Sequence, residues 1–224
     1  MSAVHRVLVF DINETLLDLS PLDAIFASRL GEARIRREWF ASLLSSAFAL
    51  SLCGSYRSFT DLGASAARIV AKNYGGDPEG LWSAIRDALP ALRAYPDVAP
   101  ALERLSRAGF RMAALSQSPQ STLDAQLTGA GIAAFFTAIC SVDSIRTYKP
   151  HPAAYRMVAR RFECDLSNIL MIAAHDWDVA GAMAAGCSAA FVARPGRSID
   201  DVILKPTFVV GDIEELAEIL LPSR

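Results

Sequence analysis

The chain has 224 residues, enough for one large domain or for a core with a modest inserted domain. Apolar residues make up 52% of the chain and charged residues 21%, with a formal net charge of −2. This balance is ordinary for a soluble globular protein, and the lack of a basic block argues against a nucleic-acid partner. No apolar run reaches transmembrane length and the N-terminus lacks a signal-peptide layout. We therefore expect no membrane partner and a cytoplasmic location.

The four cysteines are scattered and show neither a CxxC pattern nor a zinc-like spacing; they are Cys53, Cys140, Cys164 and Cys187. Most of them lie in apolar segments, so we predict buried free thiols rather than disulfides. Their spacing offers no metal site.

The first 90 residues change from a strand pattern to a helical pattern. Residues 4–10 are rich in apolar and β-branched residues and precede a turn, which predicts a short buried strand. Farther along, Ile35, Trp39, Leu43 and Ala47 recur at four-residue spacing and form an apolar helical stripe. Helices are predicted at 21–30, 34–52, 59–74 and 78–89, separated by glycine and proline.

After residue 95, strand and helix patterns alternate, which is typical of a parallel sheet with helices on both faces. The predicted strands are 110–115, 136–141, 168–173, 188–193 and 207–210, and the predicted helices are 98–108, 119–129, 152–162, 177–185 and 212–221. The simplest architecture is an α/β core from residues 1–15 and 95–224. An all-helical insert, residues 16–94, would follow the first strand.

Polar side chains follow four of the predicted strands at the points where the strands end. They are Asp11, Asn13 and Thr15 after the first strand, Ser116 after the second, Lys149 in the loop beyond the third, and His175 and Asp178 after the fourth. Ligands of open parallel sheets bind outside the carboxyl ends of the strands. We therefore expect these side chains to converge on one rim.

Each of these residues also has a structural explanation when it is taken alone. Asp11 and Asp178 could cap helices or turns, and Ser116 could cap the helix that follows it. Lys149 could be a solvated surface lysine. Four such residues at four successive strand ends are better explained together, as a site.

The residue types at this rim indicate nucleophilic chemistry. A carboxylate beside a lysine stays ionised and can attack carbon or phosphorus, giving a covalent ester. Ser116 and the free N–H groups that open the next helix could hold an anionic group of the substrate. Asp178 could orient Lys149 or help to position the hydrolytic water.

The segments at the strand ends resemble those of the haloacid dehalogenase superfamily, and within it those of the L-2-haloacid dehalogenases (type II). The resemblance rests on Phe10-Asp-Ile-Asn-Glu-Thr-Leu-Leu-Asp18, Leu115-Ser-Gln-Ser-Pro-Gln-Ser121, Ser141-Val-Asp143, Tyr148-Lys-Pro150 with Tyr155, and Trp177-Asp178. It implies a Rossmann-like core, a four-helix cap after the first strand, no cofactor and a homodimer.

By that resemblance, Asp11 attacks C2 of a 2-haloalkanoate, halide leaves with inversion, and water then hydrolyses the aspartyl ester. Lys149 stabilises Asp11 and the substrate carboxylate. The catalytic set would be Asp11, Lys149, Asp178, Thr15, Ser116 and His175, and the substrate-binding set Ile12, Asn13, Gln117, Tyr155, Phe40 and Trp177.

The rival within the superfamily is a phosphatase. Those enzymes carry a second aspartate where this chain has Asn13, and an acidic Mg²⁺ ligand where it has Ala174. Without a metal, the charge of a transferred phosphoryl group is left largely uncompensated. Halide is a good leaving group that needs neither an acid nor a metal, so both departures favour the dehalogenase.

Three residues depart from the dehalogenase pattern. Phe40 stands where the family has the arginine that receives the halide, and it fits either the apolar stripe or a halide contact. Gln117 and His175 replace asparagines. His175 could be structural or could act near the hydrolytic water, and Trp177 could pack or donate its indole N–H to halide.

The sequence thus predicts a metal-independent 2-haloacid dehalogenase. The alternatives are another superfamily hydrolase, either a phosphatase or a ring-opening enzyme, and a degenerate member that binds an anion without turnover.

Overall fold

The computed structural model describes residues 7–199, 202 and 205–221. Its strands form one parallel sheet in the order β3-β2-β1-β4-β5-β6, the order of a Rossmann fold. The strands are β1 (Val7–Phe10), β2 (Arg111–Ser116), β3 (Ala138–Ser141), β4 (Ile169–Ala173), β5 (Ser188–Val192) and β6 (Phe208–Val210). The expected α/β fold with a Rossmann-like sheet is confirmed. In the part of the chain described, no helix is long and apolar enough to cross a membrane.

Helices cover both faces of the sheet because side chains alternate between faces along each strand. In β1, Val7 and Val9 pack with the helices α7 (Pro152–Phe162) and α8 (Asp176–Ala185). Leu8 and Phe10 pack on the opposite face, with α5 (Val98–Arg107), α6 (Gln120–Gly129) and α9 (Ile213–Leu220). Every residue of β1 is buried, as expected for a central strand with two covered faces.

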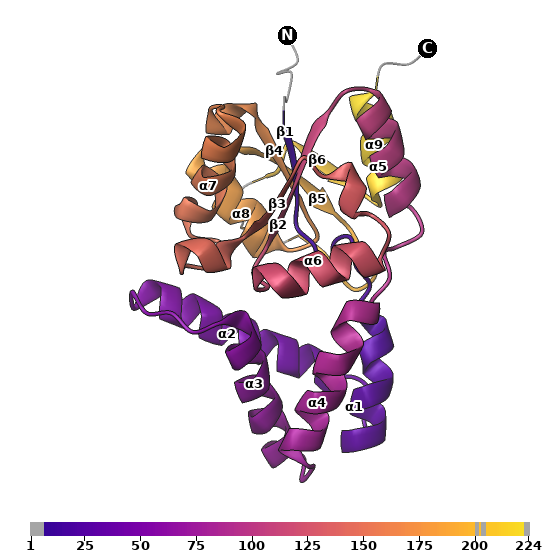
Figure 1. Ribbon diagram of the computed structural model, residues 1–224, viewed down its shortest axis with the longest axis vertical. Helices are drawn as coiled ribbons and strands as arrows, with labels where there is room; N and C mark the ends of the chain where they lie inside the picture. The colour runs from indigo at the N-terminus through magenta and orange to yellow at the C-terminus, as the bar shows by residue number, and fades with distance from the viewer. Residues whose placement is uncertain (1–6, 200–201, 203–204, 222–224) are drawn as a thin grey trace.

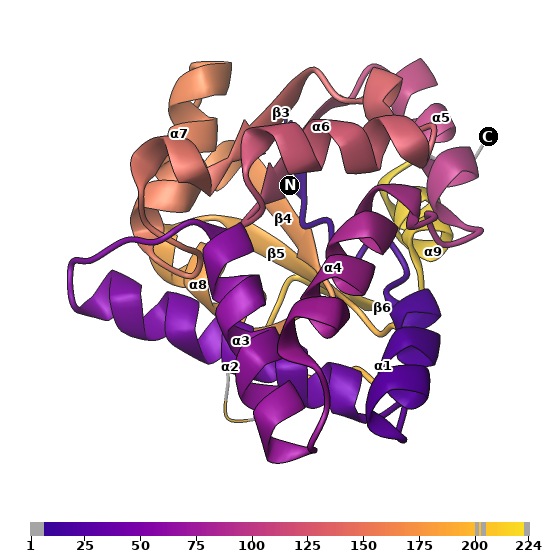
Figure 2. The same ribbon diagram turned by 60° about the horizontal axis from the view of Figure 1, so that its bottom comes forward.

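A second layer, formed by four helices, lies beyond the carboxyl ends of the strands (Figure 1). We call it the helical layer; it consists of α1 (Asp23–Leu30), α2 (Ile35–Leu52), α3 (Phe59–Asn73) and α4 (Pro78–Ala88). In Figure 2, α3 lies between α2 and α4, and both pairs are in contact. The side chains of Ser58 and Asp77 cap α3 and α4 by accepting backbone N–H groups.

The helices and strands that were predicted match the observed ones to within about two residues. The apolar stripe of α2 is buried from Ile35 to Ala47. Residues 4–6 of the first predicted strand lie outside the described residues. Ser116, expected just past a strand, is the last residue of β2. The division of the chain at residues 15 and 95 into core and cap stays a prediction.

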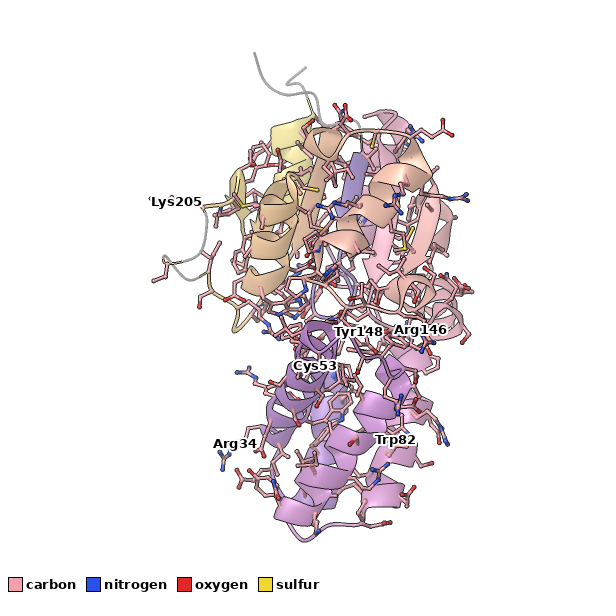
Figure 3. All side chains as sticks on the ribbon, turned by 90° about the vertical axis from the view of Figure 1, so that its left-hand side faces the viewer. Arg34, Cys53, Trp82, Arg146, Tyr148 and Lys205 are labelled. Atoms are coloured by element: carbon pink, nitrogen blue, oxygen red, sulfur yellow. The ribbon has the colours of Figure 1, made fainter. Side chains whose placement is uncertain are left out.

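The cysteines are free, as predicted, but their predicted burial holds fully only for Cys187. Cys140 and Cys164 are half-buried. Cys53 is exposed and follows the last turn of α2; in Figure 3 it lies in the part of the helical layer that is nearer the sheet.

Tyr148 lies at the junction between the helical layer and the sheet (Figure 3). Its backbone N–H donates to Ser51 Oγ at the end of α2 (3.0 Å), and its hydroxyl donates to the carbonyl of Arg57. Its ring stacks on Tyr56 with centroids 5.3 Å apart. The loop from β3 to α7 is thereby tied to the helical layer.

Arg194 ties the end of β5 to the segment that leads back from the helical layer. Its guanidinium donates to both carboxylate oxygens of Asp97 (2.7 and 2.9 Å) and, through Nε, to the carbonyl of Thr15 (2.9 Å). The Arg194 side chain is 5% exposed, and a planar guanidinium suits such a bidentate pair. Arg194 therefore holds together the two segments that connect the layers, one of which contains Thr15 and the other Asp97.

We predict that Arg194→Met lowers the free energy of unfolding by about 3 kcal/mol, because it leaves the Asp97 carboxylate partly buried without its cation. Urea denaturation followed by circular dichroism measures this loss. The control is Arg107→Met, which removes an exposed ion pair with Glu103 and should cost at most about 0.5 kcal/mol. Equal losses in the two variants would contradict the structural role of Arg194.

Candidate active site

The candidate site is organised around the ammonium group of Lys149. Lys149 Nζ donates to Asp11 Oδ1 (2.7 Å), to Asp178 Oδ2 (2.6 Å) and to the carbonyl of Leu115 (3.2 Å). The Lys149 and Asp178 side chains are fully buried, and that of Asp11 is 7% exposed. The alternative in which Lys149 is a solvated surface residue is therefore wrong.

The second carboxylate oxygen of Asp11 is held by the other side of the site. Thr15 Oγ1 donates to Asp11 Oδ2 (2.6 Å) and itself accepts from the backbone N–H of Ala174 (2.9 Å). His175 Nδ1 lies 3.0 Å from the same Oδ2. Asp11 thus sits where β1 and β4 end, at the point where the strand order reverses, which is the binding crevice of such sheets.

The charges around Asp11 decide its protonation state. Burial alone would raise the pKa of Asp11, but the Lys149 ammonium and the hydrogen bond with His175 hold it well below its usual range. Burial would lower the pKa of Lys149, yet the two carboxylates raise it above its ordinary value. The site therefore presents an ionised carboxylate, as a nucleophile requires.

Asp178 differs from Asp11 because it has no second cation. Burial, together with the neighbouring charge of Asp11, raises the pKa of Asp178 despite its contact with Lys149. The hydroxyl of Tyr155 donates to Asp178 Oδ1 (2.7 Å) and to its backbone carbonyl (3.1 Å). Asp178 is therefore fixed from both sides, and it in turn fixes the position of the lysine.

A glycine in α8 permits this arrangement. A Cβ on Gly181 would lie 2.3 Å from Pro150 Cβ and 2.7 Å from the Tyr155 hydroxyl. The absence of that atom lets the loop carrying Lys149 approach the helix that carries Asp178. This close approach gives a physical reason for glycine in the segment Asp178-Val-Ala-Gly-Ala.

Glu14 is a site residue that the sequence did not single out. Its carboxylate faces His175 Nε2 at 3.2 Å, accepts from Arg36 Nη1 of α2 at 3.0 Å, and pairs with Arg197 from the loop after β5. Burial would raise the pKa of Glu14, but the bond with His175 and the charge of Arg197 lower it to about 2. Its position beside Asp11 was visible in the sequence, but the approach of two distant arginines was not.

The expected anion-binding side chains have different surroundings. Ser116 Oγ accepts the backbone N–H of Ser118 (3.2 Å) and so braces this loop; it does not cap α6. Asn13 donates to Ser118 Oγ (3.4 Å) and accepts from Gln126 (3.2 Å). Gln117 is 5% exposed, and neither atom of its side-chain amide has a hydrogen-bond partner among the described residues.

Aromatic rings line the approach from the helical layer. The ring centroids of Phe40 and Trp177 lie 6.2 and 5.1 Å from that of His175, and Lys149 Nζ lies 5.8 Å from the Trp177 ring. A cavity of about 430 Å³ opens beside Phe40; its lining includes Asn13, Trp39, Phe40, Leu43, Phe59 and Ser118. Phe40 is 6% exposed and belongs both to the apolar stripe and to the cavity wall.

One expected binding residue is not brought to the site by its side chain. The Ile12 side chain is fully buried in the apolar cluster that contains residues of α5 and α9. Its backbone carbonyl accepts hydrogen bonds within the turn that follows Asp11. Of the other residues expected to bind substrate, Phe40, Tyr155 and Trp177 come from the helices α2, α7 and α8, and Asn13 and Gln117 lie on the loops after β1 and β2. Within the described residues, no group of three or more His, Cys, Asp or Glu is arranged to hold a metal ion.

A Rossmann-like sheet with a buried aspartate–lysine–aspartate set at its switch point defines a class of hydrolase, and comparisons with known proteins agree. The profile described as haloacid dehalogenase-like hydrolase matches residues 5–186. The chain belongs to this family of hydrolases.

Three of the proteins that it resembles are dehalogenases. Haloacetate dehalogenase H-2 of Moraxella sp. (strain B) is 30% identical over 96% of this chain and 97% of its own. The (S)-2-haloacid dehalogenase H-109 of Pseudomonas putida is 27% identical over 96% and 97%. The L-2-haloacid dehalogenase of Xanthobacter autotrophicus, solved with chloropropionic acid covalently bound, superposes with a TM-score of 0.88 at 26% identity, covering 96% and 98%.

We predict that Lys149→Met lowers the free energy of unfolding at pH 7 by about 3–5 kcal/mol, because two buried carboxylates lose their cation. Without that cation, burial raises the pKa of both carboxyl groups in the folded state. A raised pKa favours proton uptake by the folded protein, so the deficit should shrink as the pH falls from 7 to 5. Urea denaturation at both pH values measures it.

The control for this variant is Lys72→Met, which alters an exposed lysine in the last turn of α3 and should cost at most about 0.5 kcal/mol at either pH. A Lys149 variant whose deficit is the same at pH 5 as at pH 7 would contradict the buried-carboxylate explanation.

Proposed function

We propose that this hydrolase cleaves the carbon–halogen bond of short 2-haloalkanoic acids, with Asp11 as a covalent nucleophile and without a metal. The observation that carries the proposal is the double support of Asp11. Lys149 holds one carboxylate oxygen, and Thr15 and His175 hold the other. An ionised, oriented and nearly water-free carboxylate is suited to attack on carbon.

In the first step, a carboxylate oxygen of Asp11 attacks C2 of the substrate from the side opposite the halogen. The bond from oxygen to carbon forms as the bond to the halogen breaks, and halide leaves with the electron pair. The configuration at C2 is therefore inverted. Lys149 compensates the charges of Asp11 and of the substrate carboxylate while these anions are close together.

In the second step, water attacks the carbonyl carbon of the aspartyl ester. Negative charge then develops on an oxygen of Asp11, and Lys149 Nζ, 2.7 Å from Oδ1, is placed to stabilise it. The carbon–oxygen bond of the former carboxylate breaks, which releases the 2-hydroxy acid and restores Asp11. Asp178 and Tyr155 keep Lys149 in place throughout.

Gln117 supports recognition of an acid. A buried amide without partners is costly to the protein alone, and a substrate carboxylate can accept from its NH₂ group. The mainly apolar cavity beside Phe40 and Leu43 can take the alkyl part of the substrate.

Two residues weigh against phosphoryl transfer as the main reaction. Asn13 is an amide already engaged with Ser118 and Gln126, so it cannot serve as a general acid. Ala174 offers no carboxylate for a metal, and its backbone N–H is used by Thr15. The Lys149 ammonium already stands between Asp11 and Asp178, where it compensates both charges.

The dehalogenase names of the relatives, and the covalently bound chloropropionic acid in one of them, support the same reaction and the same kind of intermediate. A homodimer is part of the proposal through the family resemblance. Size-exclusion chromatography with light scattering measures that assembly directly.

The expected outcome is halide release from 2-chloropropionate or chloroacetate that is unchanged by EDTA. Asp11→Asn should lower the rate at least about 10³-fold while the variant stays folded, because an amide cannot displace halide. Ion chromatography of halide and of the hydroxy acid measures both products.

Asp124→Asn is the matched control, since Asp124 is exposed on α6, and it should keep the full rate. Phosphate release from phosphate monoesters that depends on Mg²⁺ and exceeds halide release would overturn the proposal. Binding of 2-haloacids without turnover would instead support the degenerate member of the family.

A further inference from the structure

A second cavity lies between α2 and the loop that follows β5. Its volume is about 270 Å³, and its lining comes from the segment 36–44 of α2, from residues 195–197 and from Glu14. We call it the arginine cleft, after its charged lining residues, which are Glu14, Arg36, Arg37 and Arg197. Since α2 belongs to the helical layer and the loop belongs to the sheet, both layers form the cleft.

The charged side chains of the arginine cleft range from exposed to nearly buried. Arg37 is exposed, the Arg197 side chain is 33% exposed, and those of Arg36 and Glu14 are 7% and 9% exposed. The cleft thus connects solvent with a part of the protein that holds little water. An ion bound there interacts more strongly with these charges than it would on an open surface.

The paired charges that extend from the candidate active site to the cleft balance without Arg37. Burial would lower the pKa of His175, but its bonds to Asp11 and Glu14 raise that pKa to about 8, so the ring counts as a cation at pH 7. The acids are then Asp11, Asp178, Glu14 and Asp23, and the cations that pair with them are Lys149, His175, Arg36 and Arg197. Arg37 adds one positive charge to a set that is already neutral.

Arg37 is held in the cleft although it pairs with no acid. A Cβ on Gly196 would lie 3.1 Å from Arg37 Nη2 and 3.6 Å from its Cζ, so the guanidinium rests against the backbone of the loop. Within the described part of the chain, Arg37 makes neither a hydrogen bond nor an ion pair. Packing therefore positions this guanidinium, and its N–H groups are available to a ligand.

The other two arginines of the cleft also keep donors for a ligand. A guanidinium carries five N–H groups. Arg36 uses Nε for Asp23 and Nη1 for Glu14. Arg197 uses Nη2 for Glu14. Among the described residues, no partner takes Arg36 Nη2 or the Nε and Nη1 groups of Arg197, so three guanidinium groups can donate into one small cavity.

We propose that the arginine cleft binds a small monovalent anion, and that its occupant during turnover is the halide released by the reaction. One uncompensated positive charge matches one negative charge, and the Glu14 carboxylate repels an anion of higher charge such as phosphate. Guanidinium groups are weakly hydrated, which suits the weakly hydrated chloride and bromide ions. The inference rests on the proposed function for the source of the halide.

Phe40 separates this site from the cavity that we propose for the alkyl part of the substrate. It lines both the arginine cleft and the 430 Å³ cavity and so forms a wall that they share. A halide in the cleft therefore does not compete with substrate for that cavity. If the cleft is already filled from solution, the next halide leaves more slowly, so added halide should lower kcat more than it raises KM.

The first test locates the anion without turnover. Crystals soaked in sodium bromide and measured at the bromine absorption edge should show an anomalous peak beside the Arg37 guanidinium. The peak should be lost in Arg37→Met and kept in Arg68→Met, which alters an exposed arginine on α3. Bromide found at Asp11 and Lys149 but not in the cleft would overturn the proposal.

The second test measures binding in solution. Protein-induced broadening of the chloride NMR signal, reversed by added bromide, gives the affinity of the site. Arg37→Met should weaken that affinity about 10-fold, the effect of losing one charge-assisted contact, and Arg68→Met should leave it unchanged. Equal affinities in the wild type and in Arg37→Met would show that a crystal peak is an adventitious ion only, and the proposal would fail.

The third test connects the site to turnover. Formation of the hydroxy acid from 2-chloropropionate is followed with added bromide, the ionic strength being kept constant with sulfate, whose double charge the cleft disfavours. Bromide should lower kcat in the wild type, and Arg37→Met should need about 10-fold more bromide for the same effect. Inhibition that raises KM and is equal in both proteins would place bromide in the substrate cavity and contradict the assignment.

Failure of the proposed function looks different from failure of this inference. The bromide peak and the chloride line widths do not require turnover. If the protein releases no halide from any haloacid but still binds bromide at Arg37, the anion site stands and the proposed function fails. If halide release proceeds and Arg37→Met changes neither binding nor inhibition, the proposed function stands and the arginine cleft has no such role.

Discussion

The ammonium of Lys149, buried between two carboxylates, is the interaction on which the rest of the site depends. Removing a charge from water is expensive, and the two carboxylates compensate only if the geometry is good. The structure meets that condition with short bonds to Asp11 and Asp178 and with a glycine at position 181 that lets the loop approach α8. One cation thereby joins the end of β1 to α8 and, through the carbonyl of Leu115, to β2.

From this lysine, charges alternate in sign across the site. Asp11 lies between Lys149 and His175, and Glu14 lies between His175 and the arginines Arg36 and Arg197. Asp11 and Glu14 are thus each flanked by cations, whereas Asp178 has Lys149 alone, and these pairings explain how the ionisable groups are buried together. A change of charge at Asp11 acts on its neighbours because little water is present to screen it.

Much of the fold could be predicted from the sequence because hydrophobic periodicity and turn residues are local signals. The stripe through Trp39 and Leu43 and the residues at the strand ends gave the layers and the position of the site. Because parallel strands end at one edge of the sheet, the sequence alone predicts that Asp11, Lys149 and Asp178 lie close together.

What escaped prediction depends on contacts between distant segments. Arg36 and Arg197 lie far from Glu14 in sequence, and no pattern marks them as its partners. Ile12 was expected to bind substrate by the family resemblance, but its side chain lies in the core, on the same face of the sheet as Leu8 and Phe10. Cys53 lies in an apolar segment and is nevertheless exposed, because it follows the C-terminal end of α2.

The hydrogen bond from Tyr148 to Ser51 has a mechanical consequence. Tyr148 is anchored to the helical layer, whereas the next residue, Lys149, is anchored to the sheet through Asp11. The peptide unit between Tyr148 and Lys149 therefore crosses the junction between the helical layer and the sheet. Any separation of α2 from the sheet has to break that bond or pull on the lysine. A displacement of α2 would therefore be passed along one short piece of backbone to the lysine that holds the nucleophile.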